Sequence, residues 1–170
     1  MNGIFKRTKQ FFRALTANIS PDDEKYISLH LNPEEQKLFF AMSVIDQSHC
    51  LNTAYTIERL AIQDGADICK NFLIRCALLH DCGRVKGDLN IFGKVFAVLI
   101  THFLPKLADG LELHGNKMIH VYRHHAEIGA QKLLEIGLLK ESKIVAAHHL
   151  TPKNTDPPEL KLLRIADEEN

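Results

Sequence analysis

The residues of this sequence that are best suited to catalysis or metal binding are histidines and aspartates that occur in short clusters. The chain contains ten histidines, and several end or open an apolar stretch, as in "CALLHDCG", "RHHAEIGA" and "KIVAAHH". The candidate residues are His49, His80, Asp81, His124, His125, His148, His149 and Asp167. Imidazole and carboxylate groups on apolar surfaces need partners, because an unpaired charge in an apolar interior is very unfavourable. A hydrogen bond would suffice for one histidine, but for the whole set we favour a shared cation.

The mixture of imidazole nitrogen and carboxylate oxygen indicates which cation this would be. Such ligands suit Fe, Mn, Co, Ni or Zn, and they suit Ca poorly. Cys50 and Cys82 lie beside His49 and Asp81 in the sequence, but the four cysteines show no C-x-x-C spacing. We therefore predict buried thiols rather than sulfur ligands. Without a disulfide framework or a secretory signal pattern, the expected location is the cytoplasm.

The elements that must position these residues are helices. Apolar residues recur with helical spacing along the chain, and alternating strand patterns are absent. We expect an all-α fold, with residues 1–43 as N-terminal accessory helices and 44–170 as one compact domain. The predicted helices cover 3–16, Asn32 to about 43, 44–64, 66–81, 90–113 with an interruption at Pro105, 120–136, 139–149, and the segment from Pro158 or Glu159 onward. The segment "SPDDEKYISLHL" is predicted to be a connector.

Charge and hydropathy limit the partners of the chain. Its 170 residues contain 21 basic and 21 acidic side chains, so no net charge favours nucleic acid as a partner. The most apolar run, "IFGKVFAVLITHFL", is too short and too polar to span a bilayer. It would instead form a lid, a pocket wall or an oligomer surface. Residues 1–16 are predicted to pack on the domain through an apolar face, with binding to a membrane surface as the alternative.

Taken together, the clustered residues resemble the signature of the HD superfamily of metal-dependent phosphohydrolases. That signature is a His, then an adjacent His-Asp pair, then a distant Asp. His49 in "DQSHCLNTAYTIERLA", His80 and Asp81 in "ALLHDCGR", and Asp167 in "LLRIADE" match it. A subset of the family has further His ligands and two metals, and "HAEIGAQKLLE" and "IVAAHH" resemble those segments. Arg84 stands where the family often has Lys, and "LTP" follows the second pair where some members have G-Y-P.

The resemblance implies hydrolysis of a phosphoester or phosphoanhydride, of a nucleotide, by a metal-activated water. The implied metal ligands are His49, His80, Asp81, His125, His148 and Asp167, with Asp81 bridging two divalent transition metals. His124 and His149 are the alternatives to their neighbours. The implied catalytic residues are Asp81, Arg84, which would stabilise charge on phosphate, and His149, which would protonate the leaving oxygen or join the second metal.

Three further sequence interpretations remain open at this stage. Lys86 is the other cation near the His-Asp pair, but a solvated loop residue is favoured. Asp46 would either orient His49 or cap its helix. For the whole chain, the alternatives to a phosphohydrolase are a nucleotide-sensing module with little turnover and a di-iron oxygenase.

Overall fold

The computed structural model describes residues 17–64, 70–88 and 91–170. Within these residues the regular structure is helical, with no strand, so the all-α prediction is confirmed. The helix predicted over 3–16 lies outside the described residues. The helices are α2 (Pro21–His30), α3 (Pro33–Ala41), α4 (Val44–Asp64), α5 (Lys70–Leu79), α6 (Ile91–Phe103), α7 (Pro105–Leu113), α8 (Lys117–Glu135), α9 (Leu139–Ala147) and α10 (Pro158–Glu169).

The prediction that "SPDDEKYISLHL" is a connector is wrong in part, because this segment contains helix α2. Ser20 caps this helix: its hydroxyl accepts the Asp23 backbone N–H, and the Asp23 carboxylate accepts the Ser20 N–H in return. This is a capping box, in which two unpaired backbone groups at the helix start are satisfied at once. The same arrangement at Asn32 and Glu35 starts α3 where the sequence predicted a helix. The low apolar content of α2 obscures its helical periodicity. Ser20 and Asp23, which form its capping box, are the signal by which the sequence indicates a helix here.

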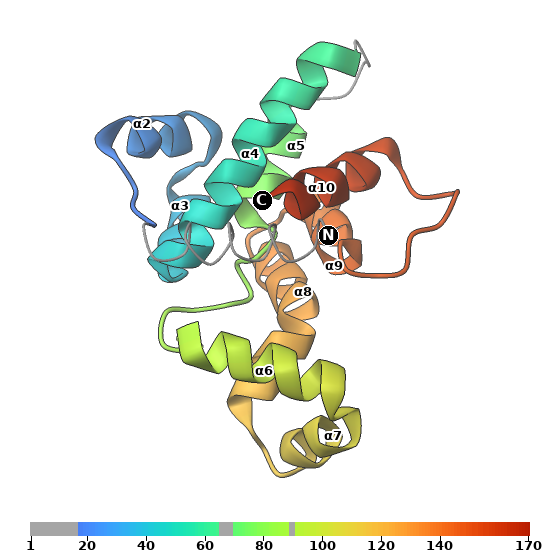
Figure 1. Cartoon of the computed structure of the whole chain (residues 1–170). Coiled ribbons are helices and arrows are strands. Elements are labelled where there is room, and N and C mark those ends of the chain that lie inside the picture. The colour runs from blue at the N-terminus through green and yellow to red at the C-terminus, as the bar shows by residue number, and fades with distance from the viewer. Residues whose placement is uncertain (1–16, 65–69, 89–90) are drawn as a thin grey trace.

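Helix α5 lies at the centre of the main core. It packs against α4, α9 and α10, and also against α2 and α3 (Figure 1). A helix that is buried on most sides must be apolar around its circumference. Its buried residues are Leu73, Ile74, Cys76, Ala77, Leu78 and Leu79. The apolar sequence before His80 is therefore the core of the domain, and the end of α5 delivers whatever follows it into the interior.

Helices α6 and α7 form a hairpin that projects from the rest of the molecule beside the start of α8 (Figure 1). A second, smaller cluster of buried residues holds this hairpin to α8, through Ala97, Ile100, Ala108 and Ile119. The break at Pro105 occurs as predicted, because proline lacks the N–H that a continuous helix needs. Among the described residues, no helix has the length and apolar character needed to cross a membrane.

Candidate metal centre

The His-Asp pair lies in a turn that directly follows α5. His80 and Asp81 are each 1% exposed, in keeping with their position at the end of the most buried helix. His80 Nε2 lies 3.8 Å from Asp81 Oδ2 and 3.7 Å from Asp167 Oδ1. Asp81 and Asp167, which lie far apart in the sequence, are thereby both brought close to the imidazole of His80.

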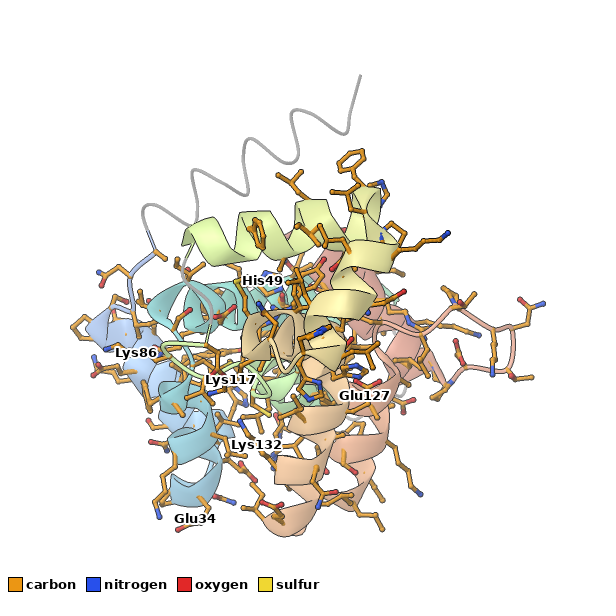
Figure 2. The ribbon with its side chains drawn as sticks, turned by 90° about the horizontal axis from the view of Figure 1, so that it is seen from below. Glu34, His49, Lys86, Lys117, Glu127 and Lys132 are labelled. Atoms are coloured by element: carbon orange, nitrogen blue, oxygen red, sulfur yellow. The ribbon has the colours of Figure 1, made fainter. Side chains whose placement is uncertain are left out.

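Helices α4 and α10 contribute the first and the last members of the series. His49 lies in the first half of α4 and Asp167 near the end of α10, and these two helices pack together. His49 Nε2 is 2.8 Å from Asp167 Oδ1. Figure 2 labels His49 in the interior of the view, away from the charged residues Glu34 and Lys86 at its edge. The four residues of the HD signature therefore meet at one place.

The remaining histidines come from α8 and from the turn after α9. His125 and His148 are buried at 3% exposure each, whereas His149 is exposed. His125 Nε2 lies 3.3 Å from Asp81 Oδ1. The ring centroids of His148 and His149 are 3.9 Å apart, and those of His125 and His149 are 4.8 Å apart. Both histidines of the second pair thus reach the centre, because α9 ends at Ala147 and a turn, rather than a helix, carries them.

Three of these imidazoles are held in the same way. His80, His125 and His148 each have Nδ1 at hydrogen-bond distance from the carbonyl three residues earlier, at 2.8, 2.9 and 2.6 Å. A carbonyl can only accept, so each Nδ1 carries a proton and Nε2 is the nitrogen left to face the centre. This backbone contact is how proteins commonly fix the tautomer and orientation of a metal-binding histidine.

The buried polar atoms at the centre show whether a cation fits there. His80 Nε2, His148 Nε2 and Asp81 Oδ1 are buried and have no hydrogen-bond partner among the described residues. Leaving a buried acceptor unpaired costs about 1–3 kcal/mol, so natural proteins rarely keep three of them together. All three are electron-pair donors of the kind that binds transition metals. The residues present therefore fit a divalent cation.

The ligand atoms form three overlapping groups. One contains His49, His80 and Asp81, a second His80, His148 and Asp167, and a third Asp81, His125, His148 and His149. Within each group the candidate ligand atoms all lie within 4.8 Å of one another. Asp81 belongs to two groups, which is the position that a carboxylate bridging two metals would occupy.

A scan against protein-family models matched the HD domain over residues 47–169, which is most of the chain. The chain belongs to the HD domain family. Members of this family are mostly metal-dependent hydrolases. Searches of curated proteins and of solved structures found no match.

The residues of the three ligand groups, His49, His80, Asp81, His125, His148, His149 and Asp167, form what we call the HD centre. Its electrostatics keep both carboxylates ionised. Burial raises the pKa of Asp81, but the charge of Arg84, followed by the interaction with the His80 ring, outweighs it and holds that pKa well below its ordinary value. Burial likewise opposes ionisation of Asp167, but the hydrogen bond with His49 and the nearby ring of His80 reverse the effect and lower its pKa. Ionised carboxylates in a buried pocket are the state that a cation stabilises.

Two of the imidazoles are kept neutral. Burial, followed by the nearby charge of Arg84, lowers the pKa of His125 to about 4. Burial and the neighbouring ring of His80 also lower the pKa of His148 well below its ordinary value. A neutral imidazole is required for coordination, because a protonated ring has no free lone pair. These rings can therefore bind a metal near neutral pH without first losing a proton.

Arg84 lies closer to the centre than its loop position suggested. Its Nη1 forms an ion pair with Asp81 Oδ2 and is 3.6 Å from Asp46 Oδ1, and its Nη2 is 3.0 Å from His125 Nε2. The side chain of Arg84 is 17% exposed. Its guanidinium thus compensates the negative charge of the HD centre. Lys86, by contrast, is exposed, and its backbone N–H is bonded to the carbonyl of Ala41.

The sulfur atoms near the centre are buried thiols, as predicted. Cys50 and Cys82 are buried and free, and Cys50 Sγ lies 3.7 Å from His80 Nδ1 rather than from the unpaired Nε2. Burial raises the pKa of both thiols, to about 12 for Cys82, so neither is a thiolate at neutral pH. Neither sulfur belongs to a group of candidate ligand atoms among the described residues, and both side chains are part of the apolar core, so these cysteines are packing residues.

Sequence analysis missed a residue that positions the second pair of histidines. Arg164, on α10, donates from Nε to the carbonyl of His148 at 3.0 Å and from Nη2 to that of Ala147 at 2.8 Å. Its Nη1 pairs with Asp156 in the loop before α10. These bonds satisfy carbonyls at the end of α9 and fix the turn that carries the pair. The available signal was an arginine placed within the apolar stretch "LLRIAD".

The remaining two positions near the centre have structural tasks. Asp46 accepts a hydrogen bond from the hydroxyl of Ser43, whose oxygen lies 3.3 Å from the Asp46 backbone N–H, as at a helix start. This favours the capping interpretation, and Asp46 also faces Arg84. Gly83 lies against α8, where a Cβ atom would collide with the backbone carbonyl of His125. Its lack of a side chain is therefore needed for the contact between the end of α5 and α8.

Proposed function

We propose that this HD domain protein is a metal-dependent phosphohydrolase that cleaves a phosphoester or phosphoanhydride. The observation that carries the proposal is the position of Asp81, whose carboxylate belongs to two of the three ligand groups. The nucleotide part of the substrate rests on the family resemblance alone. The chemistry that bound divalent metals supply is the activation of a water molecule and the withdrawal of charge from phosphoryl oxygens.

The protein residues would hold the cations and the substrate. His49, His80, Asp81 and Asp167 would bind one cation, and Asp81 with His125 and His148 would bind the second. The buried Nε2 atoms of His80 and His148 support these assignments. The centre lies among apolar helices, where little water competes for the charges, and so electrostatic interactions with a substrate phosphate are strengthened.

Arg84 would act on the substrate side, and His149 would either do the same or join the second metal. The guanidinium of Arg84 offers two N–H groups that match phosphate oxygens, and it already lies beside Asp81. Binding of a cation to Asp81 would release part of this guanidinium for the phosphate. Burial lowers the pKa of His149, which favours its neutral form. Of the two roles that the sequence left open, the neutral ring supports coordination more than proton donation.

The test is turnover of phosphorylated compounds by the purified protein. The panel contains nucleoside mono-, di- and triphosphates, cyclic nucleotides and a general phosphoester, each assayed with Mn²⁺ or Fe²⁺. We expect release of phosphate or of a nucleotide product from at least one compound, and no release by Asp81→Asn. Metal binding without turnover of any compound would contradict the proposal.

One observation favours a second candidate, a module that binds a nucleotide with little turnover. Arg84 pairs directly with Asp81, the carboxylate that two cations would share. A guanidinium that stayed in this position would compete with the cations and reduce activation of water. The same panel separates the two functions, because a sensing module would show nucleotide binding by calorimetry and no product.

A further inference from the structure

A second cluster of potential metal ligands lies outside the HD centre, where α7 meets α8. It consists of Glu112, in the last turn of α7, and His120 and His124 on α8. The two histidines have the spacing H-x3-H, which places both side chains on one face of a helix. The turn between the helices contains Gly115 at φ 79°, a conformation that suits glycine. This turn brings the carboxylate of Glu112 back onto α8.

The three side chains converge on a single point. His120 Nδ1 lies 3.0 Å and His124 Nε2 lies 2.9 Å from the same oxygen, Glu112 Oε1. The three ligand atoms are all within 4.8 Å of one another, and the two ring centroids are 4.9 Å apart. Adjacent ligands on one transition metal, with bonds of about 2.0–2.2 Å, lie roughly 3–3.5 Å apart. Small shifts of the rings would accommodate an ion between them.

Arg123 and Asp109 hold the carboxylate in position from its other side. Arg123 Nη1 donates to Glu112 Oε2 at 2.9 Å and to Asp109 Oδ1 at 2.8 Å. The hydrogen bond from Arg123 is the main cause that lowers the pKa of Glu112, with His120 contributing as well. Glu112 is therefore ionised near neutral pH, and its other oxygen, Oε1, is turned toward the two imidazoles.

We propose that Glu112, His120 and His124 form a surface site for a divalent transition metal that is separate from the HD centre. Two imidazoles and one carboxylate suit Zn²⁺, Cu²⁺, Ni²⁺ or Co²⁺ better than Mg²⁺ or Ca²⁺. The site is partly open, with side-chain exposures of 21% for Glu112, 55% for His120 and 43% for His124, so water completes the coordination. In the absence of metal, both rings can donate an N–H to Glu112 instead.

Separation from the HD centre follows from the geometry of α8. His124 and His125 are neighbours, and successive residues on a helix point about 100° apart. His125 is directed toward Asp81, whereas His124 is directed toward Glu112. A metal at the surface site would link α7 to α8 through its ligands. This link would reinforce the small apolar cluster that already holds the α6–α7 hairpin to α8. The proposal does not depend on the activity of the HD centre.

The experiment measures zinc bound per chain after equilibrium dialysis at a fixed free Zn²⁺ concentration. We expect His120→Ala and Glu112→Gln each to bind one equivalent less than the wild type. His102→Ala is the matched control, since His102 is an exposed helical histidine whose ring contacts Phe103. It should bind as much zinc as the wild type. Equal zinc content in the wild type and His120→Ala would overturn the proposal.

Two further measurements identify the site directly. Addition of Zn²⁺ should shift the ring nitrogen resonances of His120 Nδ1 and His124 Nε2 in the NMR spectrum, and no such shift would overturn the proposal. The variant Asp81→Asn should keep the equivalent that His120→Ala loses, because Asp81 belongs only to the HD centre. If Asp81→Asn instead lost all bound zinc, the surface site would be disproved, whatever the result of the hydrolysis assays.

Discussion

At the scale of single residues, the HD centre combines fixed donors with unsatisfied ones. The backbone carbonyls that engage Nδ1 of His80, His125 and His148 orient the rings, and burial removes the water that would otherwise occupy Nε2. The free energy spent on burying these groups would be recovered when a cation binds. This makes the metal-binding capacity of the centre sensitive to each member of the set.

Substitution of Asp81 by Asn should have the largest effect of any single change. The amide keeps the size of the side chain but loses the negative charge that two ligand groups share. We expect metal affinity and any hydrolysis to fall by more than about 100-fold, since even residues that only support a ligand contribute 10–100-fold. Metal content by mass spectrometry and turnover on the substrate panel measure the effect.

Asp88→Asn is the matched control for this variant. It makes the same chemical change seven positions along the chain, at a carboxylate that pairs with Lys117 at 2.7 Å. We expect its metal content and turnover to equal those of the wild type. Equal losses in Asp81→Asn and Asp88→Asn would show that the first effect is not specific to the HD centre.

The pH dependence of stability should report the neutral state of His125. Its pKa is about 4 in the folded protein, against about 6.5 in an unfolded chain. Between these values the unfolded state binds a proton that the folded state does not. The free energy of unfolding of the metal-free protein should therefore decrease as the pH falls from about 6.5 to 4, by up to about 3 kcal/mol from this residue.

The variant His125→Gln isolates that contribution. Glutamine does not titrate, so urea unfolding between about pH 7 and pH 4.5 should show a smaller decrease for the variant than for the wild type. The other buried groups titrate in both proteins, and to a first approximation they cancel in the comparison. Identical slopes in the two proteins would contradict the assignment of a neutral, buried His125.

At the scale of elements, the contact between the end of α5 and α8 sets the distance between Asp81 and His125. Gly83 makes this contact possible, because its backbone lies directly against that of α8. A glycine is required at this position because the two backbones pack closely.

Gly83→Ala should therefore separate α5 from α8 and disturb the HD centre. Overpacking of this kind typically costs about 1–3 kcal/mol, and backbone atoms yield less readily than side chains. We expect a decrease of at least about 2 kcal/mol in the free energy of unfolding, with weaker metal binding. Denaturant unfolding and metal titration measure the two effects.

Gly110→Ala is the matched control for Gly83→Ala, and its effect on stability should be opposite. Gly110 lies inside α7, and a Cβ atom there would meet nothing within 4 Å. Alanine is favoured over glycine in a helix by about 0.5–1 kcal/mol, so this variant should be slightly more stable than the wild type. If Gly83→Ala were also neutral or stabilising, the close packing of α5 on α8 would not be required.

At the scale of the whole molecule, the HD centre connects the helices of the main core. Its candidate ligands come from α4, the turn after α5, α8, the turn after α9, and α10. Binding of a cation would therefore stabilise the folded chain as a unit, because the unfolded chain cannot assemble these ligands. The α6–α7 hairpin contributes no candidate ligand to the three groups found among the described residues.

Addition of Mn²⁺ to the metal-free protein should raise the melting temperature. At 100 times the dissociation constant, binding adds about 2.7 kcal/mol, or roughly 5–10 °C for a chain of this size. Excess chelator should reverse the shift. Asp81→Asn should melt at the same temperature with and without Mn²⁺, and a shift of wild-type size in this variant would place the stabilising metal elsewhere.

The sequence by itself determined most of the described helices, with α2 as the exception, and the identity of the clustered residues. Helical periodicity, Pro33 at the start of α3 and Pro105 between α6 and α7 are local signals, and local signals set secondary structure. The series from His49 to Asp167 was also recognisable, because its members follow apolar helix faces in a fixed order. The cap at Ser20 was available in the same way and was overlooked.

Only the tertiary structure decided which atoms meet. His49 and Asp167 lie 118 residues apart and come within 2.8 Å because α4 and α10 pack together. The choice between His124 and His125 depends on which face of α8 turns toward α5, and Arg84 Nη2 comes within 3.0 Å of His125 Nε2 because the end of α5 packs on α8. These outcomes follow from packing between distant elements, and packing depends on the shape of both surfaces, which no single stretch of sequence contains.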